Sequence, residues 1–194
     1  MDVVLKKPGL LRWLQVYRLY RSAFPASERK PFSIIVKMYR AGKTDLWCLE
    51  RDGKLEGFAS TINGEERILL DYLAVSPESR GRGLGTAAMK QLLEKYADFG
   101  LFVEIESVFE DCPDLEIREK RRDFYRRCGL EPLGVLAEVF GVNMELLGRN
   151  CRLDFADYQA FYRNHYSPWA AEHIRKTKNA PFGDMEAVPN REDP

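Results

Sequence analysis

A glycine-rich basic loop constrains this chain more than any other segment. It follows the apolar run Leu69–Val75 and reads Ser76-Pro-Glu-Ser-Arg80-Gly-Arg-Gly-Leu-Gly85-Thr86, with a helical pattern behind it. Glycines present successive backbone N–H groups with no Cβ in the way, and a helix start adds the positive end of its dipole. The order of strand, loop and helix therefore predicts a site for a phosphorylated ligand.

Composition narrows the class of protein. The 194 residues fit one sizeable domain, and 30 basic residues balance 30 acidic ones to a formal charge of +0, which gives nucleic-acid binding no support. The 4 cysteines form no Cys-x-x-Cys pair, so neither a metal site nor a disulfide framework is indicated. The N-terminal segment lacks the apolar core of a signal peptide and no run is long enough to span a bilayer, so we expect a cytoplasmic protein that binds no membrane.

Hydrophobic periodicity and turn signals predict an α/β domain over residues 1–150. The expected helices span residues 9–24, 32–39, 84–96 and 115–127. The expected strands span residues 47–51, 54–62, 67–75 and 101–108, with two more within 131–148. Asp52-Gly53 and Asn63-Gly64 are strong turn dipeptides, so the first three strands are expected to form an antiparallel meander. The helix between the strands at 67–75 and 101–108 predicts that these two are parallel neighbours.

The remaining C-terminal residues are expected to form a helical extension at 151–177 that packs on this domain. Asp154 is expected to cap a helix running through Tyr166, ahead of Pro168. The extension is rich in aromatic residues, which indicates packing, while a dimer contact or a cover over a substrate site are the other interpretations. The polar segment 178–194 is expected to be a flexible tail.

The glycine loop has a rival interpretation as a dinucleotide site. Gly83-Leu-Gly85-Thr-Ala-Ala88 satisfies Gly-x-Gly-x-x-Ala, and Glu104 or Glu106 follows after roughly twenty residues, as that site requires. However, a dinucleotide fold places its first glycine directly after a strand of a βαβ unit, whereas here a charged loop intervenes and the earlier strands form hairpins. A Walker-type loop fails, because no Lys-Ser/Thr follows the glycines.

The pattern Arg80-x-x-Gly83-x-Gly85 between a strand and a helix resembles the acyl-CoA-binding motif of the GNAT superfamily of N-acetyltransferases. The run Arg122-Asp-Phe124-Tyr125-Arg-Arg-Cys-Gly129 resembles a later helix of the same family, and the resemblance covers roughly residues 8–147. It implies a mixed, mostly antiparallel seven-stranded sheet flanked by helices. It also implies transfer of an acetyl group from acetyl-CoA to a primary amine by direct attack, or, as the alternative, a non-catalytic acyl-CoA-binding or regulatory domain.

The resemblance further assigns a donor site. The pyrophosphate of CoA is expected on the N–H groups of residues 80–86, beside the Arg80 and Arg82 side chains. The pantetheine arm is expected along the backbone of residues 73–75, where this strand splays from residues 101–106, with the thioester carbonyl facing a nearby N–H. The implied donor-binding residues are Leu73, Ala74, Val75, Arg80, Gly81, Arg82, Gly83, Leu84, Gly85 and Thr86.

Such a transfer needs an acid for the departing thiolate and a route for the amine proton. Tyr125 matches the family's usual acid position, and a core aromatic is its other interpretation. Asp71, Glu104 and Glu106 are the candidate bases, with a water chain as the alternative. Asp71 is expected to share the strand face of Leu73, and the two glutamates are expected to share one face of their own strand.

The acceptor site is expected beside the link between the first two helices, because this link commonly forms an acceptor wall in the family. Within the link, Glu28 and Arg29 are the candidate substrate-binding residues. A small-molecule amine is the expected acceptor, and a monomer or homodimer the expected assembly. The cluster Lys120-Arg-Arg122 is interpreted as a solvated helix face, or else as a contact for the CoA 3′-phosphate.

Overall fold

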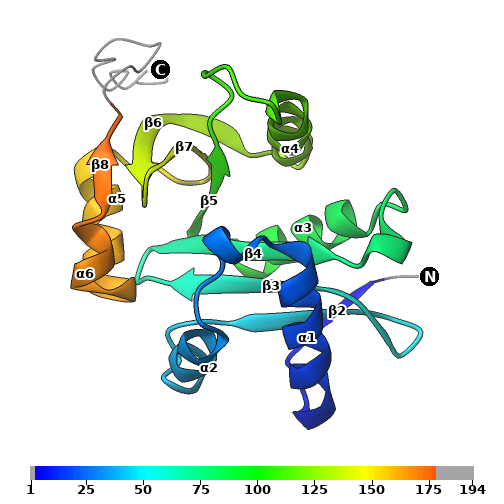
Figure 1. Cartoon of the computed structure of the whole chain (residues 1–194). Helices are drawn as coiled ribbons and strands as arrows, with labels where there is room; N and C mark the ends of the chain where they lie inside the picture. The colour runs from blue at the N-terminus through cyan, green and yellow to red at the C-terminus, as the bar shows by residue number, and fades with distance from the viewer. Residues whose placement is uncertain (1–2, 178–194) are drawn as a thin grey trace, which may run out of the picture.

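Eight strands form one mixed sheet within residues 3–177, the part of the chain that the computed structural model describes (Figure 1). In their order across the sheet, the strands are β1 (Val4–Lys6), β2 (Leu46–Arg51), β3 (Lys54–Asn63), β4 (Arg67–Val75), β5 (Gly100–Glu106), β7 (Val142–Arg149), β6 (Glu131–Val139) and β8 (Ile174–Lys176). The strands β4 and β5 pair in parallel, as expected, and every other strand pair within residues 3–177 is antiparallel. The seven strands implied by the family resemblance are one too few. The six strands expected from the sequence pattern omit the edge strands β1 and β8, which at three residues each are too short to show an alternating pattern.

Six α-helices accompany the sheet in the same described range. They are α1 (Leu10–Ala23), α2 (Phe32–Arg40), α3 (Leu84–Lys95), α4 (Leu115–Arg127), α5 (Phe155–Phe161) and α6 (Pro168–Ala171). Asp154 caps α5 by accepting a hydrogen bond from the Asp157 N–H at 2.7 Å. The helix expected to continue to Tyr166 instead passes into a π-helical turn, η3 (Tyr162–Tyr166). Over residues 3–177, none of the helices has the length and apolar character that a membrane crossing demands.

Three hydrophobic clusters hold the helices against the sheet. The helices α1 and α2 pack through Tyr20 and Ile35 on one face of β2–β4, around Phe58 and Tyr72. The helix α3 covers the opposite face with Ala88, Met89 and Leu92. The C-terminal elements α5, η3 and α6 cover Leu69, Phe102 and Leu146 of β4, β5 and β7. Figure 1 shows the resulting layers, with α1 and α2 on one side of the sheet and α3 on the other.

A bulge at Asp71 separates the two parallel strands. Pairing between β4 and β5 ends at Leu70 and Val103, although β4 stays paired with β3 to Val75 and β5 stays paired with β7 to Glu106. The β3–β4 register shifts between Ser60 and Thr61, which leaves Asp71 as the extra residue. A bulge bends its strand and increases the local twist, which accounts for the opening that follows.

Candidate active site

The phosphate loop joins β4 to α3. Its first part forms the short turn η2 (Pro77–Ser79), and Gly81 and Gly83 then adopt the left-handed conformation, with φ of 74° and 75°. These positive φ angles explain why both positions are occupied by glycine, because a residue with a Cβ is strained in this conformation. Gly83 is the N-cap of α3 and provides no side-chain acceptor, so the first N–H groups of the helix are free to face a ligand. The loop therefore fits an anionic group such as a pyrophosphate.

Gly85 brings α4 close to the start of α3. A Cβ at this position would lie 3.3 Å from the ring of Phe124, and 3.9 Å from the side chain of Val75. Phe124 and Tyr125 both pack on the α3 side of the core, together with Leu73 and Val75. The phosphate loop, the end of β4 and α4 therefore meet at one side of the opening.

Tyr125 is a half-buried phenol on this side of the opening. Burial raises the pKa of Tyr125 to about 12, although the nearby charge of Arg121 acts in the opposite direction. The side chain therefore carries its proton at neutral pH and is available as a donor. Its ring contacts that of Phe124, with the centroids 5.0 Å apart, which fixes its orientation.

Asp71 points to the opposite face of the sheet from Leu73, so the expectation of a shared face is wrong. The bulge adds one residue and reverses the alternation of side chains after Leu70. Asp71 accepts a hydrogen bond from the Lys30 ammonium at 2.6 Å, in the link between α1 and α2. The same face carries Tyr72, whose hydroxyl donates to the Glu28 carbonyl at 3.0 Å. Asp71 therefore faces the expected acceptor wall and is ion-paired there.

Glu104 is the first residue of β5 past the pairing with β4, directly across the opening from Asp71. Its carboxyl group accepts hydrogen bonds from Tyr158 at 2.7 Å and Tyr162 at 2.8 Å, both from the C-terminal extension. Burial raises the pKa of Glu104 above its ordinary value. The hydrogen bonds from the two phenols and the charge of Lys30 lower this pKa, but their effect is smaller than that of burial. The extension therefore supplies two hydrogen-bond donors to Glu104.

The other two carboxylates lie toward the outer end of the opening. Glu106 pairs with Arg121 of α4 and lies 3.9 Å from Arg118. Glu28 is exposed in the short turn η1 (Ala26–Glu28), where partial burial and the charge of Glu106 raise its pKa. Arg29 donates to the Arg21 carbonyl at 3.2 Å. Glu28 and Glu106 therefore face each other closely enough to interact, whereas Arg29 folds back on α1.

Sequence reasoning missed three residues of this wall. Lys30 pairs with Asp71, and Tyr158 and Tyr162 bind Glu104. In the sequence, Lys30 resembles any other lysine of a charged loop. Its ion pair with Asp71, which identifies it as part of the site, is visible in the structure. The tyrosines lie four residues apart on a helical pattern, which indicated packing. The contacts of all three residues join segments at least 41 residues apart in the sequence.

Comparison with known proteins places this architecture in a family. A family model described as "Acetyltransferase (GNAT) family" matches residues 13–130, whereas no curated protein sequence matches. A GNAT-family protein from Bacteroides thetaiotaomicron shares the fold with a TM-score of 0.67 and 19% identity, over 84% of this chain and 94% of that one. Spermidine N-acetyltransferase from Vibrio cholerae, in complex with CoA and spermine, shares the fold with a TM-score of 0.62 and 14% identity. The alignment covers 76% of this chain and 95% of that one.

A third solved structure shares the same fold. Aminoglycoside 6′-N-acetyltransferase complexed with coenzyme A gives a TM-score of 0.64 and 17% identity, over 77% of this chain and 96% of that one. The family match begins within α1, at residue 13, and continues through the phosphate loop and α4 to residue 130. By its sequence, its sheet and its glycine loop, the chain belongs to the GNAT family of acetyltransferases.

Proposed function

We propose that this protein transfers the acetyl group of acetyl-CoA to a primary amine of a small molecule, by direct attack. Membership of the GNAT family indicates an acyl-CoA-dependent acetyltransferase. The observation that carries the proposal is the opening between β4 and β5, which has the phosphate loop and Tyr125 on one side and a wall of charged residues on the other.

The donor is held by backbone groups and by loop arginines. The N–H groups at the start of α3 receive the pyrophosphate, and exposed Arg80 and Arg82 add charge-assisted contacts. The unpaired edge of residues 73–75 on β4 receives the pantetheine arm. Acetyl-CoA supplies an activated acyl carbon, and the chain's residues orient it toward the acceptor wall.

Proton transfer is divided between the two sides of the opening. The amine nitrogen forms a bond to the acyl carbon as the carbon–sulfur bond breaks, and Tyr125 gives its proton to the departing thiolate. The amine proton leaves toward the acceptor wall, where Asp71, Glu104 and Glu106 each already have a partner. Water between these groups therefore accepts that proton first, with the carboxylates holding the water in place.

The two segments that border the acceptor region favour a small acceptor. The link between α1 and α2 provides one boundary and the C-terminal extension the other, and they meet where the Lys30 nitrogen lies 4.2 Å from the centre of the Tyr166 ring. This contact closes one side of the acceptor region. A long peptide would need that side open, whereas a small amine would not. The solved acetyltransferases of spermidine and aminoglycosides provide the matching class of acceptor.

Donor binding is tested by thermal shift with acetyl-CoA, CoA and NAD. The wild type is expected to gain melting temperature with both CoA compounds and none with NAD, because a ligand that binds only the folded state stabilises it. Gly83→Asp is expected to abolish the gain, since it adds a carboxylate and strain at φ 75°. Gly42→Asp is the matched control, with φ of 70° and nothing within 4 Å of the added Cβ. It is expected to keep the full response.

Turnover is tested by release of the CoA thiol with a panel of primary amines. Release that depends on an amine supports the proposal. CoA binding without release by any amine would favour the non-catalytic alternative, which the existing partners of all three carboxylates also favour. No response to either CoA compound at millimolar concentration would overturn the proposal.

A further inference from the structure

An open cavity of about 580 Å³ lies beside the phosphate loop, outside the opening between β4 and β5. The hairpin between β2 and β3 and one loop arginine form its lining, which consists of Arg51, Asp52, Lys54, Glu56 and Arg82. Three of these side chains are cationic and two are anionic, so the lining carries one net positive charge. The proposed function uses Arg82 beside the pyrophosphate but none of the other four lining residues.

The hairpin is fixed to the phosphate loop through Glu56. The Ser76 N–H donates to the Glu56 carbonyl at 2.8 Å, and the Ser79 hydroxyl donates to the Glu56 carboxylate. Arg51 donates to the same carboxylate at 3.3 Å. The hydrogen bond from Ser79, with the charges of Arg51 and Arg82, holds the pKa of Glu56 below its ordinary value. Glu56 therefore has its partners within the protein and fixes the distance between hairpin and loop.

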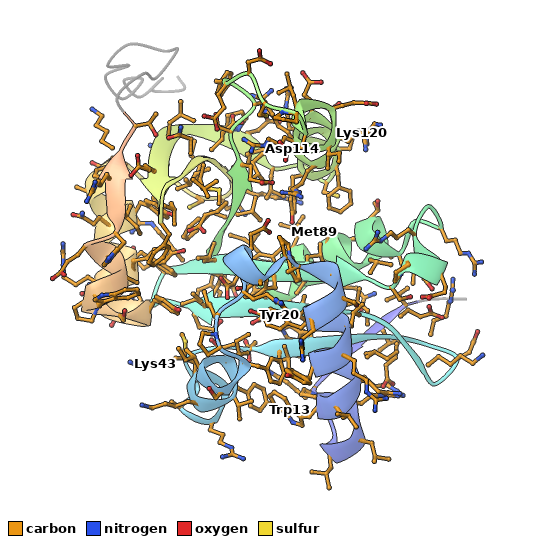
Figure 2. The ribbon with its side chains drawn as sticks, viewed as in Figure 1. Trp13, Tyr20, Lys43, Met89, Asp114 and Lys120 are labelled. Carbon is orange, nitrogen blue, oxygen red and sulfur yellow. The ribbon has the colours of Figure 1, made fainter. Side chains whose placement is uncertain are left out.

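Lys54 and Arg82 are the cations that this arrangement leaves for a ligand. Both are exposed, and neither forms an ion pair with any residue in the described range 3–177. By contrast, the cluster at 120–122 is already engaged. Lys120 extends from the outer side of α4 (Figure 2) and pairs with Glu116 at 2.5 Å. Arg122 donates to the buried Glu145 at 2.7 and 3.0 Å.

We propose that this cavity binds the 3′-phosphate of CoA, with Lys54 as a cation that contacts this phosphate alone and Arg82 as a cation shared with the pyrophosphate. The inference rests on the proposed function, because the loop must hold the pyrophosphate for the nucleotide end to reach the hairpin. A phosphate dianion meets two flexible cations without an internal partner, so binding does not require an existing ion pair to break. The carboxylate of Asp52 opposes the phosphate and weakens the contact.

The experiment compares the dissociation constants of CoA and 3′-dephospho-CoA by isothermal titration calorimetry. The wild type is expected to prefer CoA by about tenfold, from two exposed charge contacts. Lys54→Gln is expected to reduce this preference to about threefold and to leave 3′-dephospho-CoA binding unchanged. Lys43→Gln removes the same charge at the far end of the sheet from the loop (Figure 2) and is expected to keep the preference.

A second variant has an effect of the opposite sign. Asp52 adopts φ of 52°, a conformation that asparagine accepts equally well, so Asp52→Asn keeps the turn. Loss of the opposing carboxylate is expected to increase the preference for CoA by about threefold, and high salt is expected to reduce this gain.

Two results would overturn the inference. Equal binding of both compounds by the wild type would show that the 3′-phosphate makes no contact, and an undiminished preference in Lys54→Gln would place that contact elsewhere. In both cases CoA still binds, so the proposed function stands. Failure of both compounds to bind would instead overturn the proposed function, and this inference with it.

Discussion

The ammonium nitrogen of Lys30 lies 2.6 Å from a carboxylate oxygen of Asp71, at the residue where β4 separates from β5. The two side chains are only 17% and 10% exposed. Burial alone would lower the pKa of Lys30, but Asp71, Tyr166 and Glu104 raise it above its ordinary value. The ion pair therefore joins the link between α1 and α2 to β4, and Asp71 already has a partner within the protein.

Breaking this pair is expected to destabilise the protein. Lys30→Met leaves Asp71 charged and without its partner, at a cost of about 3 kcal/mol in the free energy of unfolding. The double variant Lys30→Met/Asp71→Asn is expected to lose less than the sum of the single variants, because neither charge is then left alone. Urea unfolding measures each value. Lys120→Met, which breaks an exposed pair, is the control and is expected to cost about 0.5 kcal/mol or less. Additive single effects would contradict the prediction.

Tyr125→Phe is expected to lower kcat by about a hundredfold without weakening CoA binding. The phenol is expected to donate a proton in the chemical step, while its ring supplies the packing against Phe124, which phenylalanine retains. Steady-state kinetics with the best amine of the panel measures kcat, and calorimetry measures the dissociation constant of CoA. An unchanged kcat would remove Tyr125 from the proton path and leave it as a core aromatic.

The sequence predicted the conformation of the phosphate loop better than the contacts made across the opening. The loop at residues 76–86 depends on local chemistry, since positive φ and free N–H groups require glycine at particular positions. The meander was predictable for the same reason, because turn dipeptides mark its hairpins. The bulge at Asp71 has no such signal, since nothing in Leu69–Val75 distinguishes it from a regular strand. Lys30 and Tyr162 acquire their roles only through segments distant in the sequence, so local patterns could not identify them.

Glu104→Gln is expected to remove part of the pH dependence of stability. The pKa of Glu104 is raised in the folded state, chiefly by burial, so folded Glu104 keeps its proton above about pH 4.5, where the unfolded chain loses it. Unfolding then releases a proton, and the contribution of Glu104 to stability falls as the pH rises through this window. A glutamine still accepts from Tyr158 and Tyr162 but does not ionise.

Melting temperatures measured between pH 4.5 and 8 test this expectation. The decrease with rising pH is expected to be smaller in Glu104→Gln than in the wild type. Glu116→Gln serves as the control, because Lys120 lowers the pKa of this exposed carboxylate and its contribution has the opposite sign. An identical decrease in wild type and Glu104→Gln would show that the phenols do not hold a protonated carboxyl group.

Gly57→Ala is expected to disturb the donor strand from the side of β3. An added Cβ would lie 2.4 Å from the carbonyl oxygen of Ala74 and 3.3 Å from the Cα of Val75, which are backbone atoms of β4 that cannot move aside separately. Overpacking of this kind costs about 2 kcal/mol in the free energy of unfolding. Because the pantetheine arm is expected to bind along this stretch of β4, the dissociation constant of CoA is also expected to rise. Gly42→Ala adds strain at φ 70° with no close neighbour, so it is expected to cost about 1 kcal/mol and to leave CoA binding unchanged. Weaker CoA binding in Gly57→Ala alone would therefore identify the β4 backbone, and not general instability, as the surface that receives the donor.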